Sequence, residues 1–198
     1  MLTLSSIKKT TLFFSLFLML VLSITSCGRR EVDSKEVAEE LNEPKSDVTK
    51  ESDERFLVNT VEMNFREIML GKLAQQRATS ADIKALAKVL EDAHQKANAE
   101  VSALASTKAI AVPTAASKAV MDDYEKLSQK NTKEFDLEYC NMIISNHKDM
   151  INKYESYTNG KCDQDVKIWV LGVISEERIH LAKATDMETQ AKNSVSLN

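Results

Sequence analysis

Glycine and proline are scarce in this sequence. The 198 residues include only four glycines and two prolines, so few positions force a helix to stop. The alternation of polar and apolar residues that marks a half-buried strand is also missing, whereas alanine, leucine, lysine, glutamate and methionine are abundant from about residue 53 onward. These features predict an all-α fold.

The chain also lacks an excess of positive charge. Its 26 lysines and arginines are outnumbered by 30 aspartates and glutamates, which gives a net charge of −4. A nucleic-acid-binding surface needs a basic patch, so we expect no nucleic acid partner. Neither a Gly-x-Ser-x-Gly motif nor a cluster of glycines is present, and we therefore predict no catalytic residue.

The first 27 residues resemble the signal of a bacterial lipoprotein. A positive start precedes an apolar run over residues 12–24, which is too short to span a bilayer but suits a secretory signal. The tetrapeptide ITSC that follows is similar to a lipobox, whose cysteine is lipidated and becomes amino-terminal. We therefore expect a signal peptide at residues 1–26 and a lipidated Cys27 that attaches the protein to a membrane of the bacterial cell envelope. Gly28 is not the aspartate that often retains lipoproteins in an inner membrane, which favours the outer membrane facing the periplasm. The alternatives are a secreted protein and an uncleaved anchor.

Composition divides the remaining chain into three parts. Residues 27–52 are highly charged and poor in large apolar side chains, which predicts a flexible tether with at most a transient helix. Residues 53–189 form the predicted helical domain, and residues 190–198 are predicted to be a disordered tail. The helices assigned below separate Cys140 from Cys162 by more than a disulfide can bridge, so we expect two free thiols.

Apolar residues recur every three or four positions in four long segments of the predicted domain. These segments are residues 53–78, 80–108, 135–157 and 164–188. Pro113 ends the second segment, and a shorter helix over residues 115–129 leads to the third. Such stripes form the seam of a four-helix bundle, and we expect one with a long crossover that contains the short extra helix between the second and third long helices. Gly160, in the turn before the fourth segment, suits a left-handed helix end.

Five polar side chains interrupt these apolar stripes. They come from all four long segments and are Glu67, His94, His147, Glu177 and His180. A carboxylate in a core is strongly disfavoured unless it is paired, neutralised or bound to a metal. If the second and third long helices run parallel, a rise of about 1.5 Å per residue brings these side chains to one level within about a turn. Two interpretations follow, which are a metal site and a set of core histidines satisfied by nearby carboxylates and carbonyls.

Four segments follow one another behind the secretion signal, and they are EIMLGKLA (67–74), DAHQKANAEV (92–101), NHKDMINKYE (146–155) and RIHLAKA (178–184). Together they resemble a bacterial envelope family that is catalogued as domain of unknown function 4142 and regarded as ferritin-like. The resemblance implies a four-helix bundle with a long crossover and supplies no established activity. In this family the histidines of the second and third helices often follow an aspartate, but Ala93 and Asn146 stand in those places here.

Ferritin-like di-iron proteins carry a glutamate on two helices and Glu-x-x-His on the other two. The matching positions of this chain are Glu67, Glu91-x-x-His94 and Glu177-x-x-His180. Glu91 is therefore a further candidate ligand. The third long segment presents His147 without a carboxylate at its level, and a histidine-rich site suits zinc, copper or one iron better than a di-iron centre.

Together these features predict an envelope lipoprotein, attached to the lipid membrane through Cys27, whose ferritin-like domain holds a transition metal for storage, sensing or redox protection. The competing interpretation is a non-enzymatic interaction module that binds another envelope protein. In that case the buried histidines have a structural role.

Overall fold

The computed structural model describes residues 32–42 and 48–196, which contain six helices and no strand. The all-α prediction is confirmed for this part of the chain. The helices are α1 (Ser34–Leu41), α2 (Val48–Arg77), α3 (Ala81–Thr107), α4 (Lys118–Ser128), α5 (Thr132–Asn159) and α6 (Gln164–Ser196). The predicted signal peptide and Cys27 lie outside the described residues. Within those residues, no helix has the length and apolarity needed to span a membrane.

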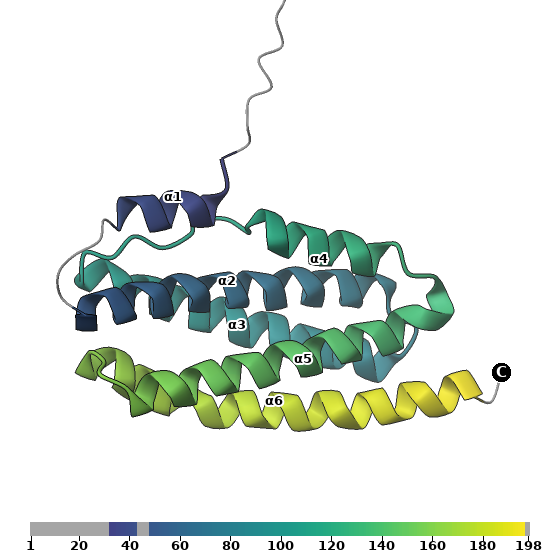
Figure 1. Ribbon diagram of the computed structural model, residues 1–198. Helices are drawn as coiled ribbons and strands as arrows, with labels where there is room; N and C mark the ends of the chain where they lie inside the picture. The colour runs from purple at the N-terminus through teal and green to yellow at the C-terminus, as the bar shows by residue number, and fades with distance from the viewer. Residues whose placement is uncertain (1–31, 43–47, 197–198) are drawn as a thin grey trace, which may run out of the picture. The chain divides into compact units, whose positions relative to one another are not determined.

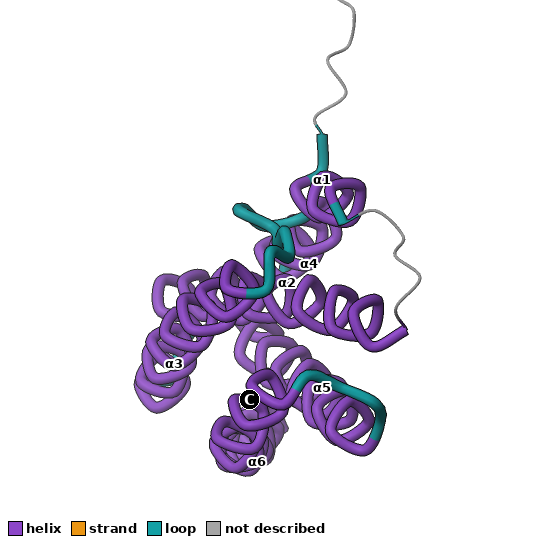
Figure 2. The backbone as a smooth tube through the Cα atoms, turned by 90° about the vertical axis from the view of Figure 1, so that its left-hand side faces the viewer, coloured by secondary structure: helices purple, strands orange, loops and turns teal. Residues whose placement is uncertain are grey.

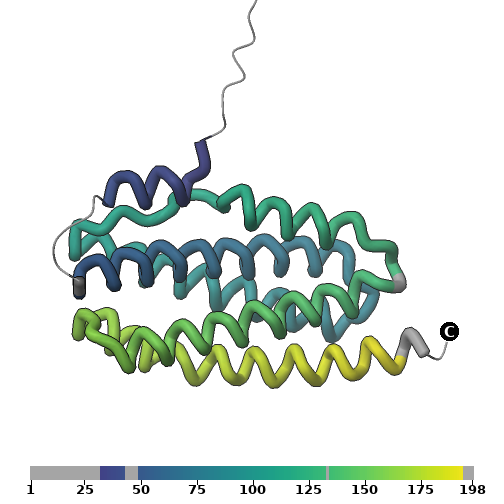
Figure 3. The backbone as a smooth tube through the Cα atoms, in the orientation of Figure 1, coloured from purple at the N-terminus to yellow at the C-terminus, as the bar shows by residue number. Residues whose placement is uncertain are grey.

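The four long helices α2, α3, α5 and α6 lie side by side around a shared core (Figures 1 and 2). Short turns join α2 to α3 and α5 to α6, and the two helices of each pair run in opposite directions. The connection from α3 to α5 passes along the outside of α2 and contains α4, so that α3 and α5 run in the same direction (Figure 3). This shared direction is the condition under which the five polar side chains should meet.

Polar side chains fix the turns between the helices. Ser80 caps α3 by accepting a hydrogen bond from the N–H of Ile83 at 3.3 Å. The Asp136 carboxylate of α5 accepts the backbone N–H groups of Thr79 and Ser80, each at 2.9 Å, and so ties the α2–α3 turn to α5. These bonds satisfy donors that a helix start otherwise leaves unpaired.

The left-handed residue of this fold is not the expected glycine. No glycine in the described part of the chain has a positive φ, so the prediction for Gly160 is wrong. The residue with φ of 52° is Ala109, just after α3, where the N–H of Ile110 reaches back to the carbonyl of Ala105 at 3.0 Å and closes the helix end. At Gly160 the backbone instead continues in a right-handed turn, with its N–H donating to the carbonyl of Tyr157 at 3.1 Å.

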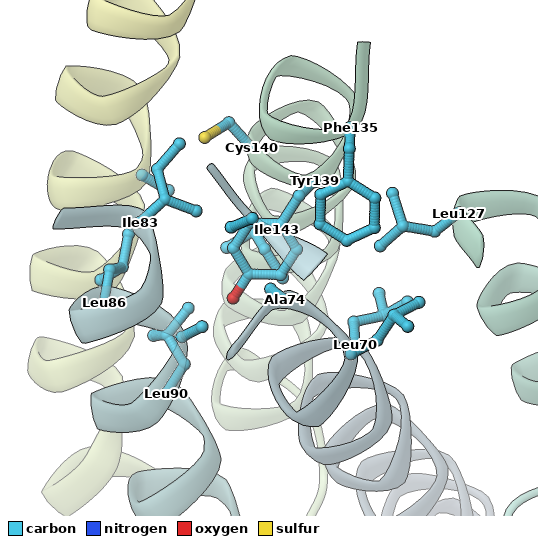
Figure 4. Packing of buried hydrophobic residues seen from close by; sticks show 14 of the residues in the cluster. Leu70, Ala74, Ile83, Leu86, Leu90, Leu127, Phe135, Tyr139, Cys140 and Ile143 are labelled. Atoms are coloured by element: carbon cyan, nitrogen blue, oxygen red, sulfur yellow. The ribbon is translucent and has the colours of Figure 1, made fainter. Parts of the chain in front are cut away.

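Buried apolar side chains form two separate clusters along the long helices. The first apolar cluster lies toward the α2–α3 turn, and Figure 4 shows side chains of α2, α3, α4 and α5 meeting in it. Its large members include Leu70, Leu90, Leu127, Phe135, Tyr139 and Ile143. The second apolar cluster lies toward the α5–α6 turn and includes Phe56, Leu57, Met63, Met150, Tyr154 and Ile174. Cys140 is buried in the first cluster and Cys162 is half-buried, and both are free thiols, as predicted.

Both ends of the described chain are more ordered in secondary structure than their composition indicates. Residues 34–41, within the predicted tether, form α1, and Asn42 exchanges two hydrogen bonds with the backbone of Ala111 at 2.8 and 2.9 Å. Lys35 pairs with Glu62 of α2 at 2.6 Å. At the other end α6 continues to Ser196, so residues 190–196 are helical where the sequence predicts a tail.

Candidate metal centre

A layer of buried polar side chains separates the two apolar clusters. We call it the polar layer, and it consists of the five residues selected from the sequence, Glu67, His94, His147, Glu177 and His180, none of which is more than 3% exposed. On each long helix the polar residue stands where the buried stripe passes from one cluster to the other. His147, for example, lies four residues after Ile143 of the first cluster and three before Met150 of the second. Helical periodicity therefore turns these polar groups inward along with their apolar neighbours.

Four of the five residues form a compact group. One potential ligand atom from each of His94, His147, Glu177 and His180 lies within 4.8 Å of all the others. Oε2 of Glu177 lies 3.4 Å from Nε2 of His147 and 3.9 Å from Nε2 of His94. The same oxygen lies 3.8 Å from Nδ1 of His180. Ligands at about 2.0–2.1 Å from a tetrahedral metal are roughly 3.4 Å apart, so the side chains have to draw together, the most distant by about 1 Å, to hold one first-row ion.

Hydrogen bonds outside the group orient two of the imidazoles. Nδ1 of His147 donates to the backbone carbonyl of Ile143 at 2.9 Å, and Nδ1 of His94 donates to Oδ1 of Asn64 at 3.0 Å. Each Nε2 then carries a lone pair, and these two nitrogens face each other at 3.5 Å. Oε2 of Glu177 and Nδ1 of His180 are buried and have no hydrogen-bond partner within the described chain. Three acceptor atoms, Nε2 of His94, Nε2 of His147 and Oε2 of Glu177, thus converge, and a cation satisfies such an arrangement.

Burial also sets the protonation of these ligands. Burial, with smaller contributions from His147 and His180, lowers the pKa of His94 to about 3, although the negative charge of Glu177 opposes this shift. The pKa of His147 is lowered as well, chiefly by burial. For Glu177, burial favours the neutral form, but contact with the surrounding imidazoles prevails and holds its pKa below the usual value. Two neutral imidazoles and a charged carboxylate are the forms in which these side chains bind metals.

Glu67 lies on the other side of His147. Its Oε1 is 3.9 Å from Nδ1 of His147, whereas Nε2 of that ring faces the four-residue group. Both carboxyl oxygens of Glu67 are buried and lack a hydrogen-bond partner among the residues described. Burial, together with the negative charge of Glu177, raises the pKa of Glu67 to about 8, although the neighbouring Asn146 opposes part of this shift. The structure therefore places Glu67 beside the four-residue group rather than within it.

Glu91, the other carboxylate considered from the sequence, faces away from the polar layer. Its two oxygens accept hydrogen bonds from Gln75 at 2.6 Å and from Gln95 at 2.7 Å. Its side chain is also 4.0 Å from the amine of Lys72 at the surface. The Glu-x-x-His spacing on α3 therefore does not bring its glutamate to His94, unlike the same spacing on α6.

Several polar neighbours of the site were not predicted from the sequence. Asn64 is fully buried and orients His94, and it lies on the same stripe of α2 as Glu67, three residues earlier. Other buried polar atoms lack a hydrogen-bond partner in the described residues, among them Nδ2 of Asn64, Oδ1 of Asn98, Nδ2 of Asn146 and the hydroxyls of Tyr139 and Tyr154. A signal existed in the spacing, because Asn98 follows His94 by four residues and Asn146 directly precedes His147.

The fold and the site together define an all-helical protein with a buried group of three histidines and one glutamate. Its sequence matches the family described as Domain of unknown function (DUF4142) over residues 38–187, and the chain belongs to this family. The match begins within α1 and covers every residue of the polar layer. No curated protein and no solved structure matches the chain.

Proposed function

We propose that this protein binds one transition-metal ion in the polar layer. The observation that carries this proposal is the convergence of Nε2 of His94, Nε2 of His147 and Oε2 of Glu177, three acceptor atoms with no donor among them, beside the unpartnered Nδ1 of His180. Three imidazole nitrogens and one carboxylate oxygen suit zinc, copper or iron.

Four protein ligands favour holding the metal over catalysis with it. Structural sites are closed by four protein ligands, whereas catalytic sites keep one position open for water or substrate. All four ligand residues are buried, so the ion would be shielded from solvent. Storage or sensing is therefore a better match than an enzymatic role. Glu67 would support the site from behind His147. Burial keeps its carboxyl group protonated up to a pH of about 8, and loss of this proton when a divalent ion binds nearby would add a second negative charge.

The wider setting of this proposal is a ferritin-like four-helix bundle on an envelope lipoprotein. The crossover through α4 and the shared direction of α3 and α5 support the ferritin-like interpretation. The lipobox at Cys27 supports attachment to a membrane, with the outer membrane facing the periplasm favoured. Replacement of Cys27 by alanine should move the protein from the membrane fraction to the soluble fraction, and unchanged fractionation would contradict lipid attachment.

Metal analysis of protein purified without a histidine tag tests the central proposal. The chain has only three histidines, and all three lie in the group, so no other imidazole can contribute to binding. We expect about one metal ion per chain, loss of that metal in a His94→Ala/His147→Ala double variant, and a lower melting temperature after chelation. Glu91→Gln is the matched control, because Glu91 bonds to Gln75 and Gln95 outside the group and its replacement should leave the metal in place.

One observation favours the competing role as an interaction module. Ile168, Leu171 and Ile179 expose more than half of their surface and, by their spacing, share one face of α6, and exposed apolar side chains gathered on one face are typical of a protein-interaction surface. Under this alternative, the purified protein would contain far less than one metal ion per chain, and a chelator would leave its melting temperature unchanged.

A further inference from the structure

His180 stands at the edge of the metal group and links it to the surface. Nδ1 of its ring lies 3.8 Å from Glu177, inside the protein, and Nε2 lies 3.9 Å from Oε1 of Glu176. The Glu177 side chain is 4% exposed, whereas that of Glu176 is 59% exposed. The two nitrogens of one buried ring therefore face a buried carboxylate on one side and a solvated carboxylate on the other.

The other two imidazoles are fixed in ways that His180 is not. Nδ1 of His94 is bonded to Asn64, and Nδ1 of His147 is bonded to the carbonyl of Ile143. Nδ1 of His180 is buried and has no such bond within the described chain. Of the three rings, His180 is thus the one that no hydrogen bond to a residue outside the group orients in the described chain.

Glu176 and His180 lie along the seam between α6 and α3. At one end of this seam Nε1 of Trp169 donates to Glu100 of α3 at 3.1 Å and bridges the two helices. At the other end a groove of about 300 Å³ opens between α3 and α6, lined by side chains that include Val89 and Lys183. Trp169, Glu176, His180 and Lys183 follow one another at spacings of seven, four and three residues, which places them on one face of α6.

We propose that a divalent metal ion reaches the buried group along this seam, through Glu176 and then His180. Glu176 first attracts the hydrated ion at the surface. The ring of His180 then brings the ion to Glu177, His94 and His147 and stays bound as the fourth ligand, while Glu176 stays outside the final set of ligands. This inference rests on the proposed function and adds the route by which the site is filled.

The test compares the rate at which the protein binds a metal ion with its equilibrium affinity for that ion. The full chain is stripped of metal and mixed with Co²⁺, and quenching of the fluorescence of Trp169, the only tryptophan, is followed in time. Glu176→Gln should slow association about tenfold at low ionic strength, less so at high salt, and leave the equilibrium affinity within about twofold. Asp186→Asn, which removes the same charge from another exposed position of α6, is the control and should leave the rate unchanged.

Three results would overturn this route. They are an unchanged association rate in Glu176→Gln, an equal slowing in Asp186→Asn, and a large loss of equilibrium affinity in Glu176→Gln, which would make Glu176 a ligand of the final site. Each of these leaves the metal site itself intact. If the unaltered protein takes up no Co²⁺ at equilibrium, the proposed function fails and the route fails with it.

Discussion

The polar layer and the two apolar clusters occupy the same stripes of the same helices, yet their side chains are satisfied to different degrees. In the clusters, residues such as Leu70, Phe135 and Ile143 are fully buried against apolar neighbours. In the polar layer, both carboxyl oxygens of Glu67 and Oε2 of Glu177 are also buried but have no hydrogen-bond partner in the described residues. Apolar burial stabilises the fold by itself, whereas a buried unpaired acceptor costs free energy until a partner arrives.

The two regions therefore have different roles: the apolar clusters stabilise the fold, and the polar layer provides the proposed binding site. The apolar clusters on either side of the polar layer pack the four long helices together, so the polar layer does not have to stabilise the fold. A site with unsatisfied acceptors can persist only within such a frame. Substitutions in the two regions should therefore differ in sign and in their dependence on metal.

The largest effect is expected in the first apolar cluster. Leu70→Ala removes a fully buried side chain and should lower the free energy of unfolding by about 2–5 kcal/mol. Denaturant unfolding measures this loss, which should be similar with and without a chelator because Leu70 contacts apolar neighbours. Leu70→Met, which nearly conserves the volume, should cost less than about 1.5 kcal/mol. An equal loss in both variants would contradict the packing account.

A substitution in the polar layer should have the opposite sign in metal-free protein. The pKa of Glu67 is raised from 4.5 to about 8 by burial, so the folded state holds its proton more tightly than the unfolded state does. Stability should therefore fall as the pH rises from about 4.5 to 8. Glu67→Gln removes this dependence and should be more stable than the unaltered protein at pH 9, by on the order of 5 kcal/mol, with little difference at pH 4.5. Denaturant unfolding of both proteins at pH 4.5 and pH 9, with a chelator present, measures the difference in stability. A difference that does not change with pH would contradict a raised pKa of Glu67.

Asn64 tests whether orientation of the ligands matters for the metal. Asn64→Ala removes the acceptor for Nδ1 of His94 and should weaken metal binding about 10- to 100-fold, since supporting hydrogen bonds typically have effects of this size. Competition with a chelator of known affinity measures the change. Asn59→Ala is the control, because Asn59 lies on α2 beside a surface groove. Equal affinities of the two variants would show that the bond to His94 does not affect the metal.

The smallest effects are expected at two glycines of the long helices. A Cβ on Gly71 would lie 3.0 Å from the carbonyl oxygen of Ala87, so Gly71→Ala should push α2 from α3 and destabilise the protein by about 1–2 kcal/mol. A Cβ on Gly172 meets nothing within 4 Å among the described residues, so Gly172→Ala should stabilise α6 by up to about 1 kcal/mol. Thermal unfolding measures the change in stability of both variants. A change of the same sign in both would refute the close contact of α2 with α3.

Helical periodicity predicts most of this fold from the sequence, because stripes such as those around His94 and His147 mark one face over many turns. The long helices accordingly begin and end within a few residues of the predicted positions, except at the two chain ends. At the two chain ends, a few specific long-range contacts hold the helical segments against the rest of the protein. Asn42 bonds to Ala111, which lies far along the chain, and Ala191 packs into the first apolar cluster late in α6. Neither contact can be predicted from the composition of the segment that makes it.

At the candidate site too, some features follow from one helix alone and others depend on how neighbouring helices pack. Polar residues in apolar stripes were sufficient to select the five members of the polar layer, because an inward position follows from spacing within one helix. Spacing does not show how neighbouring helices are rotated, and for this reason Glu91 was considered although it faces Gln75. Asn64 was missed for a related reason, since an amide in a helix gives no sign of its partner until the second helix is placed.

X-ray absorption at the metal edge of protein loaded with one equivalent of Zn²⁺ tests the central claim most directly. The proposal predicts four nitrogen or oxygen ligands at about 2.0–2.1 Å, with the multiple-scattering signature of about three imidazoles. A spectrum dominated by water oxygens or sulfur, or one without imidazole scattering, would contradict a metal site formed by His94, His147, Glu177 and His180.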